Sequence, residues 1–254
     1  MAILKTGAMF KQLTFGGVNS TDYGVYITGE AVYNAPERAA EIVSVPGRNG
    51  ALVLDGGYWR NIQVTYPAGA FADSQSDFRE NIAAFRNALV SKIGYQRLTD
   101  TYNPGEFRMA AYVSGIEVDP GLRGRAGEFD ITFECKPQRW LISGEAEVAI
   151  SASGATITNP ELVASRPLIK VTGNGTLSVG DYTIVIAAGA TNPVYIDCDI
   201  MEAYEINSAG HIVERNNLIE YGGLSFPQIE PGVNTVTWSG SITAVSMTPR
   251  WWRL

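Results

Sequence analysis

The sequence contains no apolar run approaching the ~20 residues that a membrane-spanning helix needs, so membrane insertion is not expected. Its first residues, MAILKTGAMFKQL, lack the continuous apolar stretch of a secretory signal. Basic residues are also in the minority, with 19 Lys and Arg against 26 Asp and Glu and a net charge of −7. This balance disfavours nucleic-acid readers and proteins that bind anionic membranes, because both depend on Lys and Arg.

Side chains that commonly perform catalysis or bind metals are scarce. The single histidine, His211, lies in a predicted turn, where a surface role is more common than a catalytic one. The two cysteines, Cys135 and Cys198, each follow the apolar alternation of a strand, which favours buried free thiols over a disulfide between them. One histidine and two distant cysteines cannot form a His-rich metal site. We therefore expect no cofactor and no enzymatic activity.

Charged residues make up only 18% of the chain, while 27 glycines and 12 prolines are spread along it. That spacing favours many short strands joined by turns over a few long helices. The sequence therefore predicts a mainly β protein, with a β-rich N-terminal domain over 1–142, a linker over 143–166 and a C-terminal β-sandwich over 167–254. The linker is predicted because residues 141–167 are rich in small side chains and end in two X-Pro signals.

The stretch VPGRNGALVLDGGYW (45–59) is rich in glycine, which raises the question of a phosphate-binding loop. Such loops continue into a helix, and the Walker type ends in Lys-Ser/Thr. Here a strand follows, YWRNIQVTY (58–66), in which alternation places Tyr58, Ile62, Val64 and Tyr66 on the same face. The pattern instead predicts a long hairpin with a tight turn at Asn49-Gly50.

One segment, 73–94, has helical periodicity. Phe78, Ile82, Phe85, Leu89 and Ile93 recur at spacings of 4, 3, 4 and 4, which places them on one helical face. Ser74, with Asp77 three residues later, resembles a capping box, and Gly94 supplies a C-terminal stop.

Two patterns in the C-terminal region leave alternatives open. Asp197 and Asp199 would lie ~7 Å apart on one strand face, a separation that a glycosidase or a calcium site permits. Trp251 and Trp252 are weak candidates for a sugar-stacking platform, although packing within the protein is the commoner role of such a pair. The alternatives to a structural protein are therefore a carbohydrate-binding module that contacts a cell surface and a glycan hydrolase that uses Asp197 and Asp199.

The ordered set of motifs along nearly the whole chain resembles the distal tail protein family of long-tailed, non-contractile bacteriophages. The matching segments are FKQLTFGGVNSTDYGVYITG (10–29), VPGRNGALVLDGGYWRN (45–61), the helix 76–92, GEFDITFECKPQRWL (127–141), NPVYIDCDIMEAY (192–204), FPQIEPGVNTVTWSG (226–240) and TPRWWRL (248–254).

The resemblance implies an N-terminal domain that forms a ring of six copies and a C-terminal galectin-like sandwich outside the ring. It implies a hub in the virion tail, assembled in the bacterial host cytoplasm, that joins the tail tube protein to tail-tip lysin, fibre or receptor-binding proteins. DNA passes transiently through the centre of such a ring. The predicted hairpin would be an arm that reaches the next copy, so Arg48 and Asn49 at its tip and Arg123 and Arg125 in a loop are the interface candidates.

Overall fold

The computed structural model describes residues 11–30, 34–121, 123–223 and 225–254. Contacts divide the chain into two compact units, Met1–Arg139 with Leu254 and Trp140–Arg253. The first ten residues, considered above for a secretory signal, lie outside the described part. Within that part no helix is long and apolar enough to cross a membrane.

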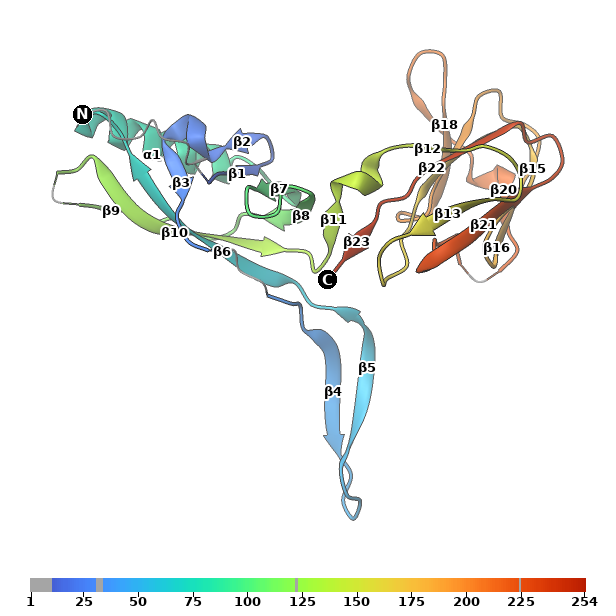
Figure 1. The fold of residues 1–254 in the computed structure, drawn as a ribbon, viewed down its shortest axis with the longest axis horizontal. Coiled ribbons are helices and arrows are strands. Elements are labelled where there is room, and N and C mark those ends of the chain that lie inside the picture. The colour runs from blue at the N-terminus through green and yellow to red at the C-terminus, as the bar shows by residue number, and fades with distance from the viewer. Residues whose placement is uncertain (1–10, 31–33, 122, 224) are drawn as a thin grey trace. The chain divides into compact units, whose positions relative to one another are not determined.

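Unit 1 is built on an antiparallel sheet in the order β2-β1-β7-β8-β10-β6-β3, with β9 paired to β10 (Figure 1). Its elements are β1 Leu13–Phe15, β2 Val18–Asn19, the 3₁₀ turn η1 Ser20–Tyr23, β3 Val25–Ile27, β4 Arg38–Ser44, β5 Ala51–Trp59, β6 Ile62–Phe71, α1 Gln75–Val90, β7 Gln96–Asp100, β8 Glu106–Ala111, β9 Asp119–Pro120 and β10 Ala126–Cys135.

The two longest sheet strands show the alternation that predicted them. On β10 the buried side chains are Phe129, Ile131, Phe133 and Cys135. Opposite them on β6 the buried side chains are Ile62, Val64, Tyr66, Ala68 and Ala70. Tyr58 was predicted on the same strand face but is 61% exposed. The strand is interrupted at Arg60 and Asn61, so Tyr58 belongs to β5 and not to β6.

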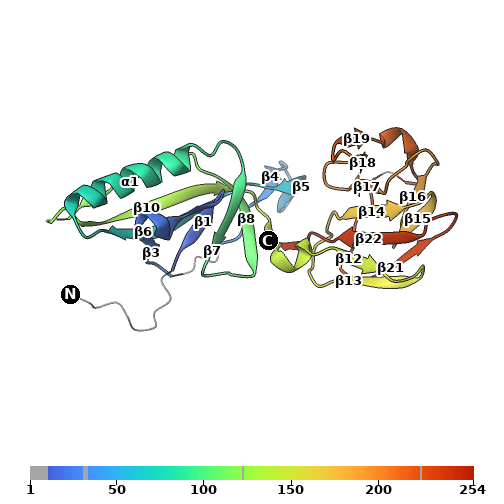
Figure 2. The ribbon, with the colours of Figure 1, turned by 90° about the horizontal axis from the view of Figure 1, so that it is seen from above.

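The predicted helix is α1, which covers one face of this sheet (Figure 2). Phe78, Ile82, Phe85 and Leu89 are buried as expected. Ile93, predicted on the same face, is 89% exposed because the helix ends at Val90. Gly94, with φ of +74°, therefore lies beyond the helix rather than ending it.

The start of α1 is fixed by Ser74, whose Oγ accepts a hydrogen bond from the Asp77 N–H at 3.0 Å. Replacing Ser74 with alanine leaves that N–H without its partner, so we expect a loss of about 1 kcal/mol in the free energy of unfolding. Urea unfolding followed by circular dichroism measures it. Ser76→Ala is the matched control, since Ser76 is an exposed helical residue, and should change stability by less than about 0.5 kcal/mol. Equal effects of the two substitutions would contradict the assignment of the cap.

Unit 2 is a sandwich of two antiparallel sheets, β12-β22-β14-β17-β18-β19 and β13-β21-β15-β16-β20 (Figure 2). Its strands are β12 Val148–Ile150, β13 Ala155–Asn159, β14 Leu168–Thr172, β15 Gly175–Val179, β16 Tyr182–Ile186, β17 Val194–Asp197, β18 Glu202–Ile206, β19 Ile212–Glu214, β20 Ile219–Tyr221, β21 Gly232–Trp238 and β22 Ala244–Thr248. The short strands β11 Arg139–Leu141 and β23 Trp252–Arg253 and the 3₁₀ turns η2 Ile142–Glu145 and η3 Asn216–Leu218 complete the element order.

The predicted C-terminal sandwich is confirmed, but the linker placed over 143–166 is wrong. Those residues contain β12, which pairs with β22, and β13, which pairs with β21, so they contribute one strand to each sheet. The contact boundary instead falls between Arg139 and Trp140. Small side chains at 143–166 are compatible with strands because the partner strands supply the hydrogen bonds.

Candidate interaction surfaces

The hairpin β4–β5 pairs with no other described strand and forms a ribbon of its own (Figure 1). Its apolar side chains are exposed on both faces. Ile42 and Val53, a cross-strand pair, are 73% and 62% exposed on one face, and Leu52 and Leu54 are 46% and 48% exposed on the other. A two-stranded hairpin is marginally stable by itself in water. The ribbon therefore has the composition of a surface that becomes buried in an assembly.

The tip of the hairpin differs from the predicted Asn49-Gly50 turn. Six residues, 45–50, connect the two strands, and the Arg48 N–H donates to the Val45 carbonyl at 3.2 Å. Pro46 and Gly47 occupy the middle of this turn, and Gly47 has φ of +80°. Proline followed by a positive-φ glycine is the sequence that a type II turn requires. Arg48 and Asn49 are exposed at the tip, which suits contact with another chain.

The base of the hairpin is held by an ion pair. Arg38 donates from Nε and Nη2 to the two carboxylate oxygens of Asp55, at 2.8 and 2.6 Å. Asp55 Oδ1 also accepts the Gly57 N–H. The bond from Arg38, followed by that from Gly57, lowers the pKa of Asp55 to about 2. The Arg38 guanidinium also lies 4.9 Å from the Trp59 ring centre.

The other two interface candidates lie in the loop before β10. Arg125 is exposed and donates to the Asp73 carbonyl at 3.1 Å, so it ties this loop to the residue before the cap of α1. Arg123 is exposed and forms no ion pair with any described residue. The structure therefore gives Arg125 a role within the chain and leaves Arg123 available to a partner.

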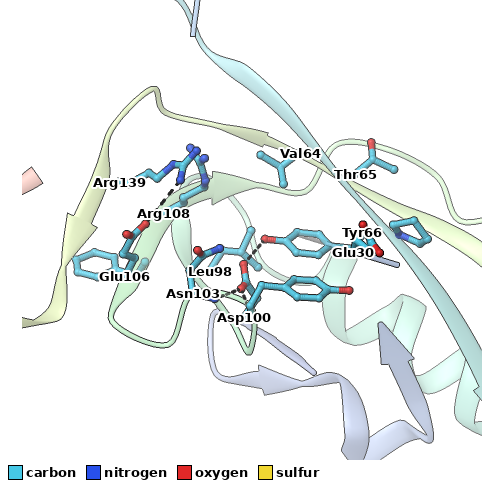
Figure 3. Close-up of a pocket in the computed structure, with 13 residues that line it drawn as sticks. Glu30, Val64, Thr65, Tyr66, Leu98, Asp100, Asn103, Glu106, Arg108 and Arg139 are labelled. Atoms are coloured by element: carbon cyan, nitrogen blue, oxygen red, sulfur yellow. Dashed lines mark hydrogen bonds and ion pairs between the residues drawn. The ribbon is translucent and has the colours of Figure 1, made fainter. Parts of the chain in front are cut away.

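A small cavity of about 30 Å³ in unit 1 is lined by charged and aromatic side chains (Figure 3). Tyr66 Oη donates to Asp100 Oδ2 at 2.8 Å, and Asp100 Oδ1 accepts the N–H groups of Tyr102 and Asn103. Burial, reinforced by Asp100, raises the pKa of Tyr66 well above its ordinary value. Tyr66 is therefore a fixed hydrogen-bond donor. Asp100 accepts this bond and also holds the turn after β7 through the two backbone N–H groups.

Two arginines complete that cavity. Burial and the neighbouring Arg139 lower the pKa of Arg108. The Arg139 guanidinium lies 3.9 Å from the Glu106 carboxylate and donates to the Asn34 carbonyl at 3.1 Å. Arg108 Nη1 and Arg139 Nε are buried and have no acceptor among the described residues. The cavity has room for about one water and is too small for a substrate.

Asp197 and Asp199 contact two different arginines, Arg250 and Arg166. β17 ends at Asp197, whose two carboxylate oxygens accept bonds from Arg250 at 2.7 and 2.8 Å. Burial alone would raise the pKa of Asp197, but the bonds from Arg250 outweigh it and hold the pKa below its ordinary value. Asp199 is exposed and lies 3.9 Å from Arg166. Within the described residues, no group of three or more His, Cys, Asp or Glu side chains could hold a metal ion.

The tryptophan pair provides no open stacking platform. Trp251 is 7% exposed and belongs to the core of unit 2. Trp252 is half-buried, and its indole N–H donates to the Ala164 carbonyl at 3.0 Å. Packing within the protein, the commoner role for such a pair, accounts for both side chains.

The remaining candidate groups are the two cysteines and the histidine. Cys135 and Cys198 are free and buried, as predicted, and burial raises the pKa of each thiol to about 12. His211 is exposed in a turn where its backbone N–H donates to the Asn207 side chain. None of these residues has the arrangement of a base and nucleophile pair.

Part of the chain matches a known family model. Residues 18–135 match the family model described as the phage tail protein RIFT-related domain. The matched residues lie within unit 1. A search of curated sequences gave no significant match.

The whole chain has the fold of solved phage tail structures. It is similar to the distal tail protein (Dit, gp 19.1) of phage SPP1, described as a paradigm of the hub adsorption apparatus in phages that infect Gram-positive bacteria. That match has a TM-score of 0.75 and 16% identity, and it covers 97% of this chain and 100% of the SPP1 chain. The resemblance to distal tail proteins that the motifs indicated is confirmed, and so is the mainly β fold class.

Chains of the phage P2 baseplate in its activated conformation have the same fold at lower similarity. The structure with Ca matches with a TM-score of 0.51 and 10% identity, over 94% of this chain and 98% of that chain. The structure with Sr matches with a TM-score of 0.52 and 11% identity, over 98% and 99%. These matches show that the fold of this chain also occurs in a phage baseplate.

Proposed function

We propose that six copies of this protein form a ring at the distal end of a non-contractile phage tail. The ring is a structural hub, with the tail tube protein on one side and tail-tip lysin, fibre or receptor-binding proteins on the other. The observation that carries the proposal is the match to the SPP1 Dit fold over 97% of this chain and 100% of the SPP1 chain, together with the match of residues 18–135 to the phage tail protein RIFT-related domain.

The surfaces of unit 1 support assembly rather than catalysis. The β4–β5 ribbon exposes apolar side chains on both faces, and a ring needs this kind of arm, one that contacts the next copy and repeats until the circle closes. The most enclosed charged cavity described above is smaller than a substrate, and its ionisable groups bond to one another. The protein is therefore proposed to act without chemistry of its own, in the virion tail, after assembly in the host cytoplasm.

DNA passage through the ring requires a bore that phosphate groups do not adhere to. The net charge of −7 suits this requirement, because a lining of Lys and Arg would retain DNA. We propose a bore that is neutral or negative.

Electron microscopy of the purified chain mixed with the tail tube protein of the same phage tests the hub. The expected result is six-fold rings with a central opening, bound at one end of tail tubes. Tubes that stay bare in the presence of excess rings would contradict the placement at the tube end, and an absence of rings would contradict the assembly itself.

A further inference from the structure

A groove lined by arginine side chains lies along one flank of α1. It has a volume of about 690 Å³ and lies between the helix and residues that precede β10. Phe78, Ile82 and Val118 supply its apolar lining. The exposed guanidinium groups of Arg79, Arg86 and Arg123 supply its charge. The groove therefore suits an occupant that is acidic and partly apolar.

The opposite flank of α1 has the complementary composition. A hollow of about 420 Å³ there is lined by Phe71, Ala72, Asp73, Asp77, Glu80 and Asn81. At roughly 100° of rotation per helical residue, Arg79 and Arg86 lie about half a turn away from Asp77. The helix thus separates an acidic flank, defined by Asp73, Asp77 and Glu80, from the arginine groove.

The charges of the two flanks are not neutralised within the chain. Among the described residues, Arg79, Arg86 and Arg123 form no ion pair, and neither does Asp77. The carboxylate of Glu80 accepts a hydrogen bond from Ser76 at 3.2 Å, which leaves its charge uncompensated. Two patches of opposite sign on one rigid element are therefore open to external partners.

We propose that the arginine groove of one copy receives the acidic flank of α1 from the next copy. This inference rests on the proposed ring. The contact joins two different surfaces, so each copy gives one flank and receives the other, which is the requirement for a closed cycle. Chains with a net charge of −7 repel one another, so local complementarity is needed to set the orientation in which they meet.

Charge reversal on either flank tests the proposal in the full chain. One variant carries Arg79→Glu and Arg86→Glu, and the other carries Asp77→Lys and Glu80→Lys. We expect each to need at least tenfold more protein than the unmodified chain to assemble to the same extent. Circular dichroism checks that both remain folded, because all four positions are exposed.

Mixing the two variants distinguishes the loss of this contact between copies from a general defect in either variant. The first variant is acidic on both flanks and the second is basic on both, so an equimolar mixture can assemble as an alternating ring. Native mass spectrometry should detect a six-chain species with three copies of each variant at concentrations where neither assembles alone.

The outcomes distinguish this inference from the ring itself. If the unmodified chain assembles and both variants assemble equally well, the flank contact is wrong and the ring stands. Impaired variants that do not recover on mixing also overturn the contact. If the unmodified chain does not assemble, the proposed function fails, and this contact fails with it.

Discussion

Replacing Ile42 and Val53 with serine should convert the proposed ring into single chains at concentrations where the unmodified protein is assembled. These side chains face each other across the ribbon and are 73% and 62% exposed in the single chain. If the next copy covers them, each substitution removes about 1–2 kcal/mol of burial energy. Since 1.4 kcal/mol is a factor of ten in affinity, the pair should raise the dissociation concentration at least tenfold. Light scattering across a dilution series measures the change.

A control for this substitution uses exposed valines outside the ribbon. Val185 and Val233 in unit 2 are 37% and 70% exposed, and their replacement by serine should leave the assembly unchanged. If the ribbon variant assembles at the same concentration as this control, the ribbon does not form the contact between copies.

The Arg250→Ala variant should lose about 2–4 kcal/mol in the free energy of unfolding of unit 2. Removing one partner of a buried ion pair costs about 3–5 kcal/mol, and the lower value allows for the partial exposure of Arg250. The side chains of Arg250 and Asp197 are 30% and 10% exposed, and two hydrogen bonds join them. Arg250 also has φ of +57°, a conformation that a non-glycine residue adopts only when its surroundings hold it.

Tryptophan fluorescence during urea unfolding of the full chain measures this loss, since four of the five tryptophans belong to unit 2. Arg166→Ala is the matched control. Its pair with Asp199 spans 3.9 Å, and the two side chains are 48% and 63% exposed, so the change should stay below about 1 kcal/mol. Similar losses in the two variants would show that the Arg250–Asp197 pair has no special role.

The lowered pKa of Asp197 makes the stability of unit 2 depend on pH, and the direction of that dependence can be worked out. A carboxyl with a lower pKa in the folded state contributes stability at pH values above its unfolded pKa, and loses it as pH falls through the folded pKa. Unit 2 should therefore become less stable on acidification below about pH 4. An Asp197→Asn variant should lack this part of the pH dependence, and an unchanged acid response would contradict the assignment.

Much of the fold could be predicted from local patterns. β10, β6 and α1 are long enough for their alternation or periodicity to be read directly from Phe129, Ile131 and Phe133 or from Phe78, Ile82 and Phe85. The strands missed in unit 2 are short and weakly patterned. β12 has the sequence VAI and β13 has ATITN, and pairing with distant partners makes them strands.

The interaction surfaces were less accessible to sequence reasoning. The hairpin arm was predicted from its glycines and β-branched flanks, because those signals are local. The Asp197–Arg250 pair joins residues 53 positions apart, and no local pattern indicates it. No local pattern distinguishes the opposite charges on the two flanks of α1 from an ordinary solvated face, because the groove beside the helix depends on where Val118, Gly121, Arg123 and Gly124 pack.

Native mass spectrometry of the purified full chain tests the central claim most directly, because it counts the copies in each species. A species of six times 27.4 kDa at micromolar concentration is the predicted result. A spectrum that contains only the 27.4 kDa chain at those concentrations would contradict the account, since an arm with apolar faces and a helix with opposite charged flanks would then have no sister copy to meet.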